Sequence, residues 1–180
     1  MQYRQDGDFP PERALVSTPV SVELQSGSEE DTRAIARALG AVLAPGDVVA
    51  LTGDLGAGKT AFCKGLGEAL GISPERIVSP SFTIVTEHAG RLPFRHVDAY
   101  RLGSIREAEE IGLDEVFRGD GVCAIEWAEK IGILLPNERI QVTFLFSEEG
   151  GDRRRLLVSA GDSPRFHEFL SRCRPFNTGG

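Results

Sequence analysis

Apolar residues follow two patterns along the chain that predict β-strands. Short continuous apolar runs at residues 48–51 and 122–125 are typical of strands buried on both faces of a sheet. Alternation of apolar and polar residues at 20–24 and 139–146 predicts strands with one buried face. Three more strands are predicted at residues 82–87, 94–98 and 156–160. The last of them can pair with 139–146 as a hairpin across the Gly150-Gly151 turn.

Helices are predicted where a serine precedes apolar residues at helical spacing. Ser28 and Ser104 each open a capping-box pattern, and apolar residues follow to Leu43 and Ile111 respectively. Ser163, followed by a proline, predicts a short C-terminal helix. Further helical stretches are predicted at residues 61–70 and 113–117. Strands and helices therefore follow one another in the order of an α/β domain with a mixed sheet.

The chain of 180 residues is long enough for one domain with a sizeable core. Residues 1–19 contain three prolines among scattered charges without a period, and we expect a disordered leader there. We expect a single domain over residues 20–173 and a flexible tail over 174–180.

Composition and charge narrow the possible functions. The formal net charge is −7, so the chain has no general basic field for nucleic acid, and any RNA would be held by a partner or a local patch. Three cysteines, far apart and odd in number, suit neither a zinc site nor a disulfide framework, and they favour buried or inert thiols. No apolar run reaches about 18 residues and no signal pattern begins the chain, so we expect a cytoplasmic protein without a membrane segment.

The most informative motif lies between the apolar run at 48–51 and the helical stretch at 61–70. It matches the phosphate-loop pattern G-x-x-x-x-G-K-[ST] at every fixed position. The residues expected to bind nucleotide are Gly53, Asp54, Leu55, Gly56, Ala57, Gly58, Lys59, Thr60 and Ala61. Lys59 would contact the β- and γ-phosphates and Thr60 would ligate Mg²⁺, while the helix N-terminus favours negative charge. The alternative is a glycine-rich turn with an incidental lysine.

Two acidic residues follow predicted strands and could complete a Mg²⁺ site. Glu126 follows the wholly apolar run at 122–125, and Asp98 ends the strand at 94–98. A phosphate loop needs such an acid at the end of a neighbouring strand. We assign Glu126 to the metal, and Asp98 to the water shell of the metal or to orienting the attacking water. Either acid alone would more often be a solvated strand end than a metal ligand.

Several other residues have a possible functional role and also a simpler structural explanation. The hydroxyl-rich segment 79–83, which ends at Thr83, could sense the γ-phosphate or could be a Ser-Pro turn. Trp127 could cover a nucleotide or a partner surface, although most tryptophans are packed. His96 is more simply a packed or solvated histidine. The basic cluster 153–155 could reach the nucleotide or an RNA backbone, or it could be the solvated edge of a hairpin.

The kind of nucleotide follows from an absent motif. A guanine-specific GTPase would carry the base-reading sequence Asn-Lys-x-Asp, and the chain has none. An adenine nucleotide is therefore expected.

In series, these blocks resemble the TsaE (YjeE) family of small bacterial ATPases, which are needed for threonylcarbamoyl modification of adenosine 37 in tRNA. The matching stretches are residues 51–60, 79–83, 96–102, 125–127 and 134–136, in the order of the family. They span most of the chain from 20 to about 160. The blocks H-x-D-x-Y-R and I-E-W are more specific than the phosphate loop. The chain departs from the usual family pattern at Ser81, Ala99 and Ala128.

The resemblance implies a phosphate-loop NTPase-like, three-layer fold with a mixed central sheet that binds ATP or ADP and Mg²⁺. It implies that Lys59 holds phosphate, that Thr60 and Glu126 hold Mg²⁺, and that Asp98 supports hydrolysis. It also suggests that Thr32 and an arginine of the 153–155 cluster, Arg154, flank the adenosine.

By the same resemblance, the protein would act with the TsaD–TsaB pair, which transfers the threonylcarbamoyl group and holds the tRNA. The ATPase would hydrolyse ATP weakly by itself and faster with that pair. Two other readings of the sequence stay open: a small-molecule kinase that uses ATP, and a nucleotide-sensing adaptor without catalysis.

Overall fold

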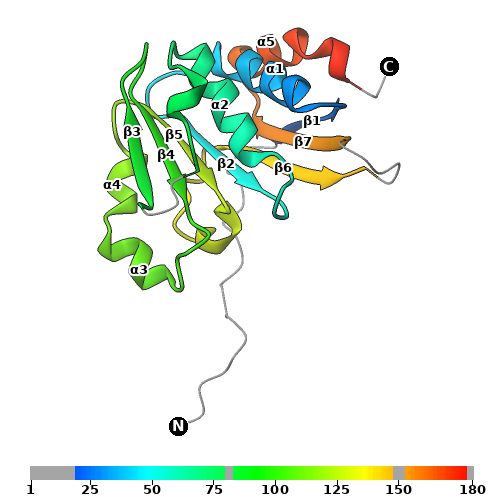
Figure 1. Ribbon diagram of the computed structural model, residues 1–180. Helices are drawn as coiled ribbons and strands as arrows, with labels where there is room; N and C mark the ends of the chain where they lie inside the picture. The colour runs from blue at the N-terminus through cyan, green and yellow to red at the C-terminus, as the bar shows by residue number, and fades with distance from the viewer. Residues whose placement is uncertain (1–18, 80–82, 148–152, 178–180) are drawn as a thin grey trace.

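The computed structural model describes residues 19–79, 83–147 and 153–177 (Figure 1). Expectations that concern residues 1–18, Pro80, Ser81, Phe82, the Gly150-Gly151 turn and residues 178–180 lie outside the described residues. Pro19, which we placed in the leader, is the first residue of a strand. Residues 174–177, which we placed in a flexible tail, include a 3₁₀ turn and a β-bridge between Asn177 and Leu24.

The described residues contain one mixed sheet of seven strands. The strands are β1 (Pro19–Ser26), β2 (Val48–Thr52), β3 (Val85–His88), β4 (Phe94–Asp98), β5 (Val122–Glu126), β6 (Ile140–Phe146) and β7 (Arg154–Gly161), in the spatial order β1-β7-β6-β2-β5-β4-β3. The central strands β6, β2, β5 and β4 are parallel to one another. The outer pairs β1–β7, β7–β6 and β3–β4 are antiparallel. The mixed sheet and the hairpin pairing of β6 with β7 are confirmed.

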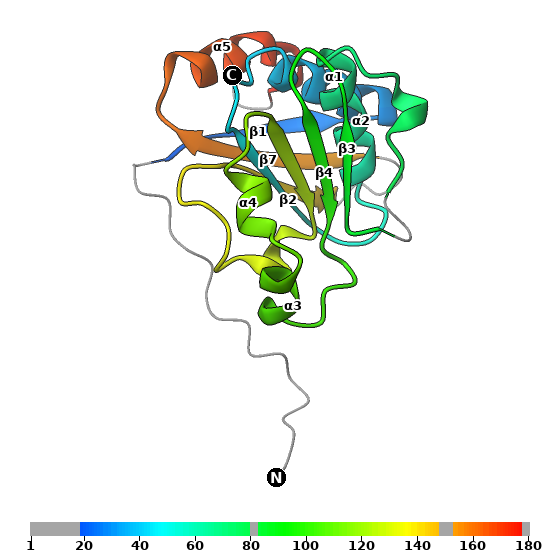
Figure 2. The same ribbon diagram turned by 90° about the vertical axis from the view of Figure 1, so that its left-hand side faces the viewer.

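Helices cover the sheet on both faces. They are α1 (Glu29–Gly40), α2 (Lys59–Ala69), α3 (Ile105–Glu110), α4 (Leu113–Phe117) and α5 (Pro164–Arg172), with short 3₁₀ turns η1 (Pro74–Arg76), η2 (Ala128–Ile131) and η3 (Arg174–Phe176). Helices α1, α2 and α5 lie on one face, and α3 and α4 lie on the other (Figures 1 and 2). The three predicted caps are confirmed, because the hydroxyls of Ser28, Ser104 and Ser163 each accept a backbone N–H of the first helical turn.

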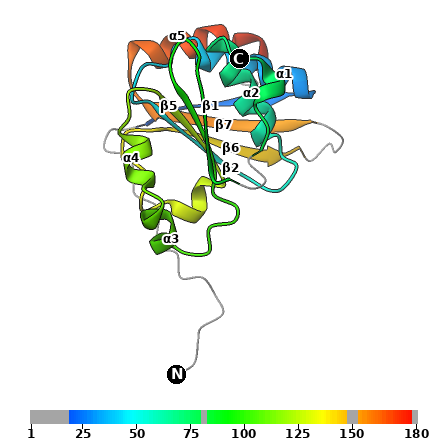
Figure 3. The same cartoon turned by 60° about the vertical axis from the view of Figure 1, so that its left-hand side comes forward.

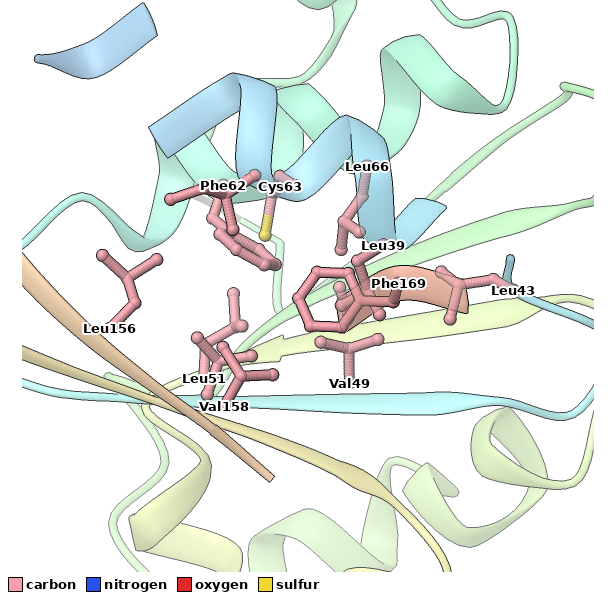
Figure 4. Packing of buried hydrophobic residues seen from close by; sticks show 14 of the residues in the cluster. Leu39, Leu43, Val49, Leu51, Phe62, Cys63, Leu66, Leu156, Val158 and Phe169 are labelled. Atoms are coloured by element: carbon pink, nitrogen blue, oxygen red, sulfur yellow. The ribbon is translucent and has the colours of Figure 1, made fainter. Parts of the chain in front are cut away.

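Two hydrophobic cores result from this arrangement, and they differ in extent. The larger core packs α1, α2 and α5 against the sheet, with Leu39, Phe62 and Phe169 fully buried in it (Figure 4). The smaller core lies between α3, α4 and the strands β2, β5 and β4. Among the described residues, no buried side chain of β1, β7 or β6 belongs to the smaller core. The three layers are therefore complete only over half of the sheet (Figure 3).

Element boundaries differ from the sequence prediction in two places. Helix α2 begins at Lys59 rather than at residue 61, because Gly58 takes a left-handed conformation and the chain turns directly from the loop into the helix. Strand β3 begins at Val85, so Thr83 and Ile84 lie outside the strand. The other predicted strands and helices are present with shifts of a few residues.

The described part of the chain also bears on the membrane and cysteine predictions. None of its helices has both the length and the apolar content needed to cross a membrane. Cys63, Cys123 and Cys173 are buried free thiols, as predicted. Burial raises the pKa of Cys123 and of Cys173 to about 12, which keeps both thiols protonated and inert.

Candidate functional site

The loop between β2 and α2 has the backbone geometry of an anion cradle. Gly53 has φ 136°, and a Cβ there would come within 2.7 Å of the carbonyl oxygen of Phe144. Gly58 has φ 108° at the start of α2, so both positions require glycine for conformation, and Gly53 also for space. The loop can therefore curve tightly with its backbone N–H groups available to a ligand.

The N-termini of α1 and α2 differ in a way that indicates where an anion would bind. The first turn of α1 carries Glu29, Glu30 and Asp31, and Ser28 caps its backbone. The first turn of α2 has no acidic residue, and no side chain caps it. Free N–H groups and the helix dipole attract negative charge. A phosphate is therefore favoured at α2 and disfavoured at α1.

Lys59 is held at the mouth of this loop by its own backbone. Its ammonium donates to the carbonyl oxygens of Gly53, at 2.5 Å, and Asp54, at 2.8 Å. The same nitrogen lies 3.8 Å from the centre of the Trp127 ring. Burial lowers the pKa of Lys59, and the nearby carboxylate of Glu126 opposes that shift. The side chain is thus almost fully buried and oriented toward the loop.

Thr60 and Glu126 form the oxygen pair expected for Mg²⁺. The Thr60 hydroxyl lies 2.9 Å from Oε1 and 3.0 Å from Oε2 of Glu126, and it donates to this carboxylate. Glu126 ends β5 and is only 3% exposed. Hydroxyl and carboxylate oxygens are the hard donors that Mg²⁺ prefers, so these residues fit that ion.

Asp98 lies beside Glu126 because the strand register places it there. Asp98 and Glu126 are paired residues at the carboxyl ends of the parallel strands β4 and β5. Asp98 accepts a hydrogen bond from the Ser79 hydroxyl at 2.8 Å and one from the Tyr100 backbone at 3.0 Å. Both acids therefore lie at the edge of the sheet where the loop leaves β2.

His96 is the site residue that sequence reasoning missed. We interpreted it as packed or solvated, and it is indeed fully buried, but its Nε2 lies 2.8 Å from Oε1 of Glu126. Its spacing of two from Asp98 was the available signal, since it places both side chains on one face of β4. Cys63 of α2 is the third member of this buried group.

Trp127 contacts Lys59 within a larger group of rings and ammonium groups. It has φ 59° and ψ 40°, and it is the only non-glycine residue with positive φ in the described ranges. The Tyr100 ring lies 5.0 Å from its ring, centre to centre. Lys130 in turn donates to the carbonyl of Tyr100 and lies over that ring. Such a strained backbone position often occurs at functional sites.

Thr32 and Arg154 lie together beside the loop. They border a cavity of about 280 Å³ lined by Ser28, Glu29, Thr32, Gly56, Ala57, Gly58, Ala61 and Arg154. The guanidinium of Arg154 lies 4.6 Å from the centre of the Phe146 ring. Arg155, its neighbour in the basic cluster, pairs with Glu23 instead. The cavity is near the lower end of the size range for small-ligand pockets.

One predicted site residue, Thr83, is not brought into the site. Thr83 is exposed, and in the described part of the chain it makes no hydrogen bond to the loop, Asp98 or Glu126. Ser79 is the hydroxyl of that segment that reaches Asp98. A larger cavity, of about 540 Å³, lies at the opposite end of β2, where Asp47 pairs with Arg165. That cavity has no phosphate loop, so the nucleotide site is expected at the smaller one.

Comparisons with known proteins identify the family of the chain. The family model for "Threonylcarbamoyl adenosine biosynthesis protein TsaE" matches residues 26–156. A relative from Bacillus subtilis (strain 168), named tRNA threonylcarbamoyladenosine biosynthesis protein TsaE, is 50% identical over 133 residues, which are 73% of this chain and 80% of the relative. A protein of the same name from Treponema pallidum is 42% identical over 125 residues, covering 69% of this chain and 92% of the relative.

A solved structure supports the fold as well. The crystal structure of Bacillus subtilis YdiB matches with a TM-score of 0.70 and 38% sequence identity, covering 88% of this chain and 97% of that chain. The matched region of the family model contains the loop, both strand-end acids and Thr32. On sequence and structure together, this chain belongs to the TsaE family.

Proposed function

We propose that the protein is a Mg²⁺-dependent ATPase that supports threonylcarbamoyl modification of adenosine 37 in tRNA. The observation that carries the proposal is the hydrogen bond between the Thr60 hydroxyl and the Glu126 carboxylate beside the phosphate loop. A hydroxyl and a carboxylate held together at this point form the metal-binding half of a phosphate-loop site.

The loop residues would bind the triphosphate. The backbone of residues 53–58 and the uncapped N-terminus of α2 supply N–H donors, and Lys59 supplies a positive charge. The Lys59 ammonium donates to the carbonyls of Gly53 and Asp54. Phosphate oxygens are stronger acceptors than these carbonyls, so Lys59 would exchange them for the β- and γ-phosphates while Trp127 keeps its position.

Thr60 and Glu126 would hold Mg²⁺, which when bound offsets the negative charge on the transferring phosphoryl group. Asp98 is next to Glu126 but is more exposed, so it can accept a hydrogen bond from a water molecule. That water, oriented by Asp98 and Ser79, is our proposed nucleophile. We propose hydrolysis rather than transfer because the partly exposed Asp98 can orient a water molecule as the acceptor.

Thr32 and Arg154 would flank the adenosine in the cavity beside the loop. Their position next to Gly56 and Ala61 supports this assignment, which the resemblance to the TsaE family first suggested. An arginine can stack on a purine ring or pair with phosphate oxygens. The aromatic partner of Arg154, Phe146, limits where its guanidinium can lie.

The proposed partners are the TsaD–TsaB pair, in the cytoplasm. The TsaE relatives are named for tRNA threonylcarbamoyladenosine biosynthesis. The net charge of −7 supports a protein that reaches tRNA through partners.

The test is ATP hydrolysis by the purified protein, alone and with the TsaD–TsaB pair, at several Mg²⁺ concentrations. We expect slow turnover alone, faster turnover with the pair, and none in excess EDTA. A variant with Lys59→Met serves as the background control. If the TsaD–TsaB pair does not increase turnover, the proposed coupling to that pair is wrong. A phosphorylated metabolite in place of free phosphate would identify a kinase instead.

A further inference from the structure

Glu126 makes a buried contact with His96 that has no role in the proposed reaction. Nε2 of His96 lies 2.8 Å from Oε1 of Glu126, and the side chains are 0% and 4% exposed. The two residues come from neighbouring strands, since His96 pairs with Ala124 and Glu126 follows two residues later on the same face. His96 therefore contacts the carboxylate from β4, while Thr60 contacts it from the start of α2.

The surroundings of His96 decide which nitrogen carries the proton. Its Nδ1 is buried without a hydrogen-bond partner in the described part of the chain. A proton on Nδ1 would leave a buried donor unsatisfied and would set the lone pair of Nε2 against a carboxylate oxygen. A proton on Nε2 instead of Nδ1 avoids both costs. We assign this tautomer from the hydrogen-bond network.

Three side chains surround the Glu126 carboxylate. Thr60 and His96 both lie within hydrogen-bond distance of its oxygens, and Cys63 borders the same carboxylate. In Figure 4 the Cys63 side chain points from α2 toward the sheet. The Glu126 carboxylate is therefore held from β4 by His96 and from α2 by Thr60.

We propose that His96 is a positioning residue for Mg²⁺ binding: by donating from Nε2, it fixes the Glu126 carboxylate in the orientation that the ion requires. A carboxylate held on one oxygen by a buried donor keeps its remaining lone pairs in a set direction. Without His96, the side chain of Glu126 could rotate, and each Mg²⁺ binding event would have to order it again. The inference rests on the proposed Mg²⁺ site at Thr60 and Glu126.

The experiment compares substitutions that do or do not replace the Nε2 donor. In His96→Gln the amide nitrogen occupies the same position along the side chain as Nε2, whereas in His96→Asn the side chain is too short to reach Glu126. The readout is Mg²⁺ titration of the full chain with a non-hydrolysable ATP analogue, followed by fluorescence of Trp127, the only tryptophan. Mg²⁺-dependent ATPase activity is a second readout, and analogue affinity in EDTA a third.

For His96→Asn we expect the half-saturating Mg²⁺ concentration to rise by about tenfold or more, as for other partners of metal ligands. Analogue affinity in EDTA should stay within about twofold of the original chain, because the phosphate loop is untouched. His96→Gln should recover most of the Mg²⁺ affinity. A merely structural histidine would not show this difference between the two amides.

His88 supplies a matched control. It lies in the same row of stacked rings, with Phe94 between it and His96, and its Nε2 also lacks a partner in the described residues. It does not contact Glu126, so His88→Asn should leave the Mg²⁺ titration unchanged. His96→Asn and His88→Asn should lower the melting temperature to a similar degree.

The outcomes separate the positioning role from the proposed function. Equal Mg²⁺ titrations for His96→Asn and the original chain would overturn the role of His96 and leave the ATPase proposal intact. An original chain that binds the analogue in a Mg²⁺-dependent way but never hydrolyses ATP would overturn the ATPase proposal. In that case the titrations of the two amide variants still decide the role of His96. A complete lack of Mg²⁺ dependence in analogue binding would overturn both.

Discussion

The ends of β4 and β5 carry the same chemical group in two different environments. Asp98 and Glu126 are register partners on one face of the sheet. Glu126 is almost fully buried and is held by Thr60 and His96. Asp98 is partly exposed and is held by Ser79 and by the Tyr100 backbone. Position in the sheet thus gives one carboxylate a fixed orientation and the other access to water.

The difference arises from what covers each strand end. Strand β5 lies between β2 and β4, and α2 packs over its carboxyl end through Thr60 and Cys63. Strand β4 has only β3 on its outer side, and the segment that carries Ser79 approaches its end. A buried carboxylate must be satisfied by protein donors, whereas an exposed one can exchange them for water. The first environment suits a metal ligand and the second suits a group that orients water.

The strongest test of this difference is Glu126→Ala. It should lower Mg²⁺-dependent ATP turnover by about 1000-fold, because removing one preorganised electrostatic group typically costs 100- to 1000-fold. Nucleotide binding in EDTA should persist, and the fold should be largely spared. Turnover with the TsaD–TsaB pair and denaturant unfolding are the measurements. Glu126→Gln, which keeps the shape, should lose turnover too, and retained activity in either variant would refute the metal assignment.

A smaller loss is expected at the neighbouring strand. Asp98→Asn should lower the maximal turnover rate by about 100-fold, the lower end of the range for acid–base groups. The half-saturating Mg²⁺ concentration should change little, because Thr60 and Glu126 are intact. Kinetics at varied Mg²⁺ check this. If Mg²⁺ affinity falls as much as turnover does, Asp98 is a direct ligand and the contrast between the two strand ends is wrong.

The smallest effect is expected for the partner of Asp98. Ser79→Ala removes one hydrogen bond from a partly exposed carboxylate, and the net value of such a bond is about 1 kcal/mol. Turnover should therefore fall by about fivefold. Thr83→Ala is the matched control, because that exposed hydroxyl makes no contact with the site in the described residues. A larger loss in Thr83→Ala than in Ser79→Ala would restore Thr83 as the γ-phosphate sensor.

Much of the fold could be predicted because its determinants are local. Continuous apolar runs at β2 and β5 and alternation in β6 gave the strands, and hydroxyl caps gave the starts of α1, α3 and α5. One error concerned a local feature and another a long-range contact. Gly58 begins α2 two residues earlier than the apolar pattern indicated, and the bridge between Asn177 and Leu24 adds structure after α5 that no periodicity signals.

From residue pattern alone, site residues could be predicted where the phosphate-loop motif or an acidic residue comes at the end of a predicted strand. The phosphate loop, Asp98 and Glu126 satisfy that condition, and the structure places them at one edge of the sheet. Lys130 could not be assigned, because its contact with Tyr100 depends on how η2 folds back after Trp127.

The sequence by itself determined which segments are strands and helices, where the phosphate-loop motif lies, and which acids follow strands. These properties depend on side-chain pattern over a few residues, and they identify the TsaE family. Only the tertiary structure decided that β4 and β5 are neighbours in the register that pairs Asp98 with Glu126. The same register places His96 beneath Glu126 and makes its contact with that carboxylate possible. The period of a strand gives the face on which a side chain lies, but its partner comes from a distant segment that only packing brings close.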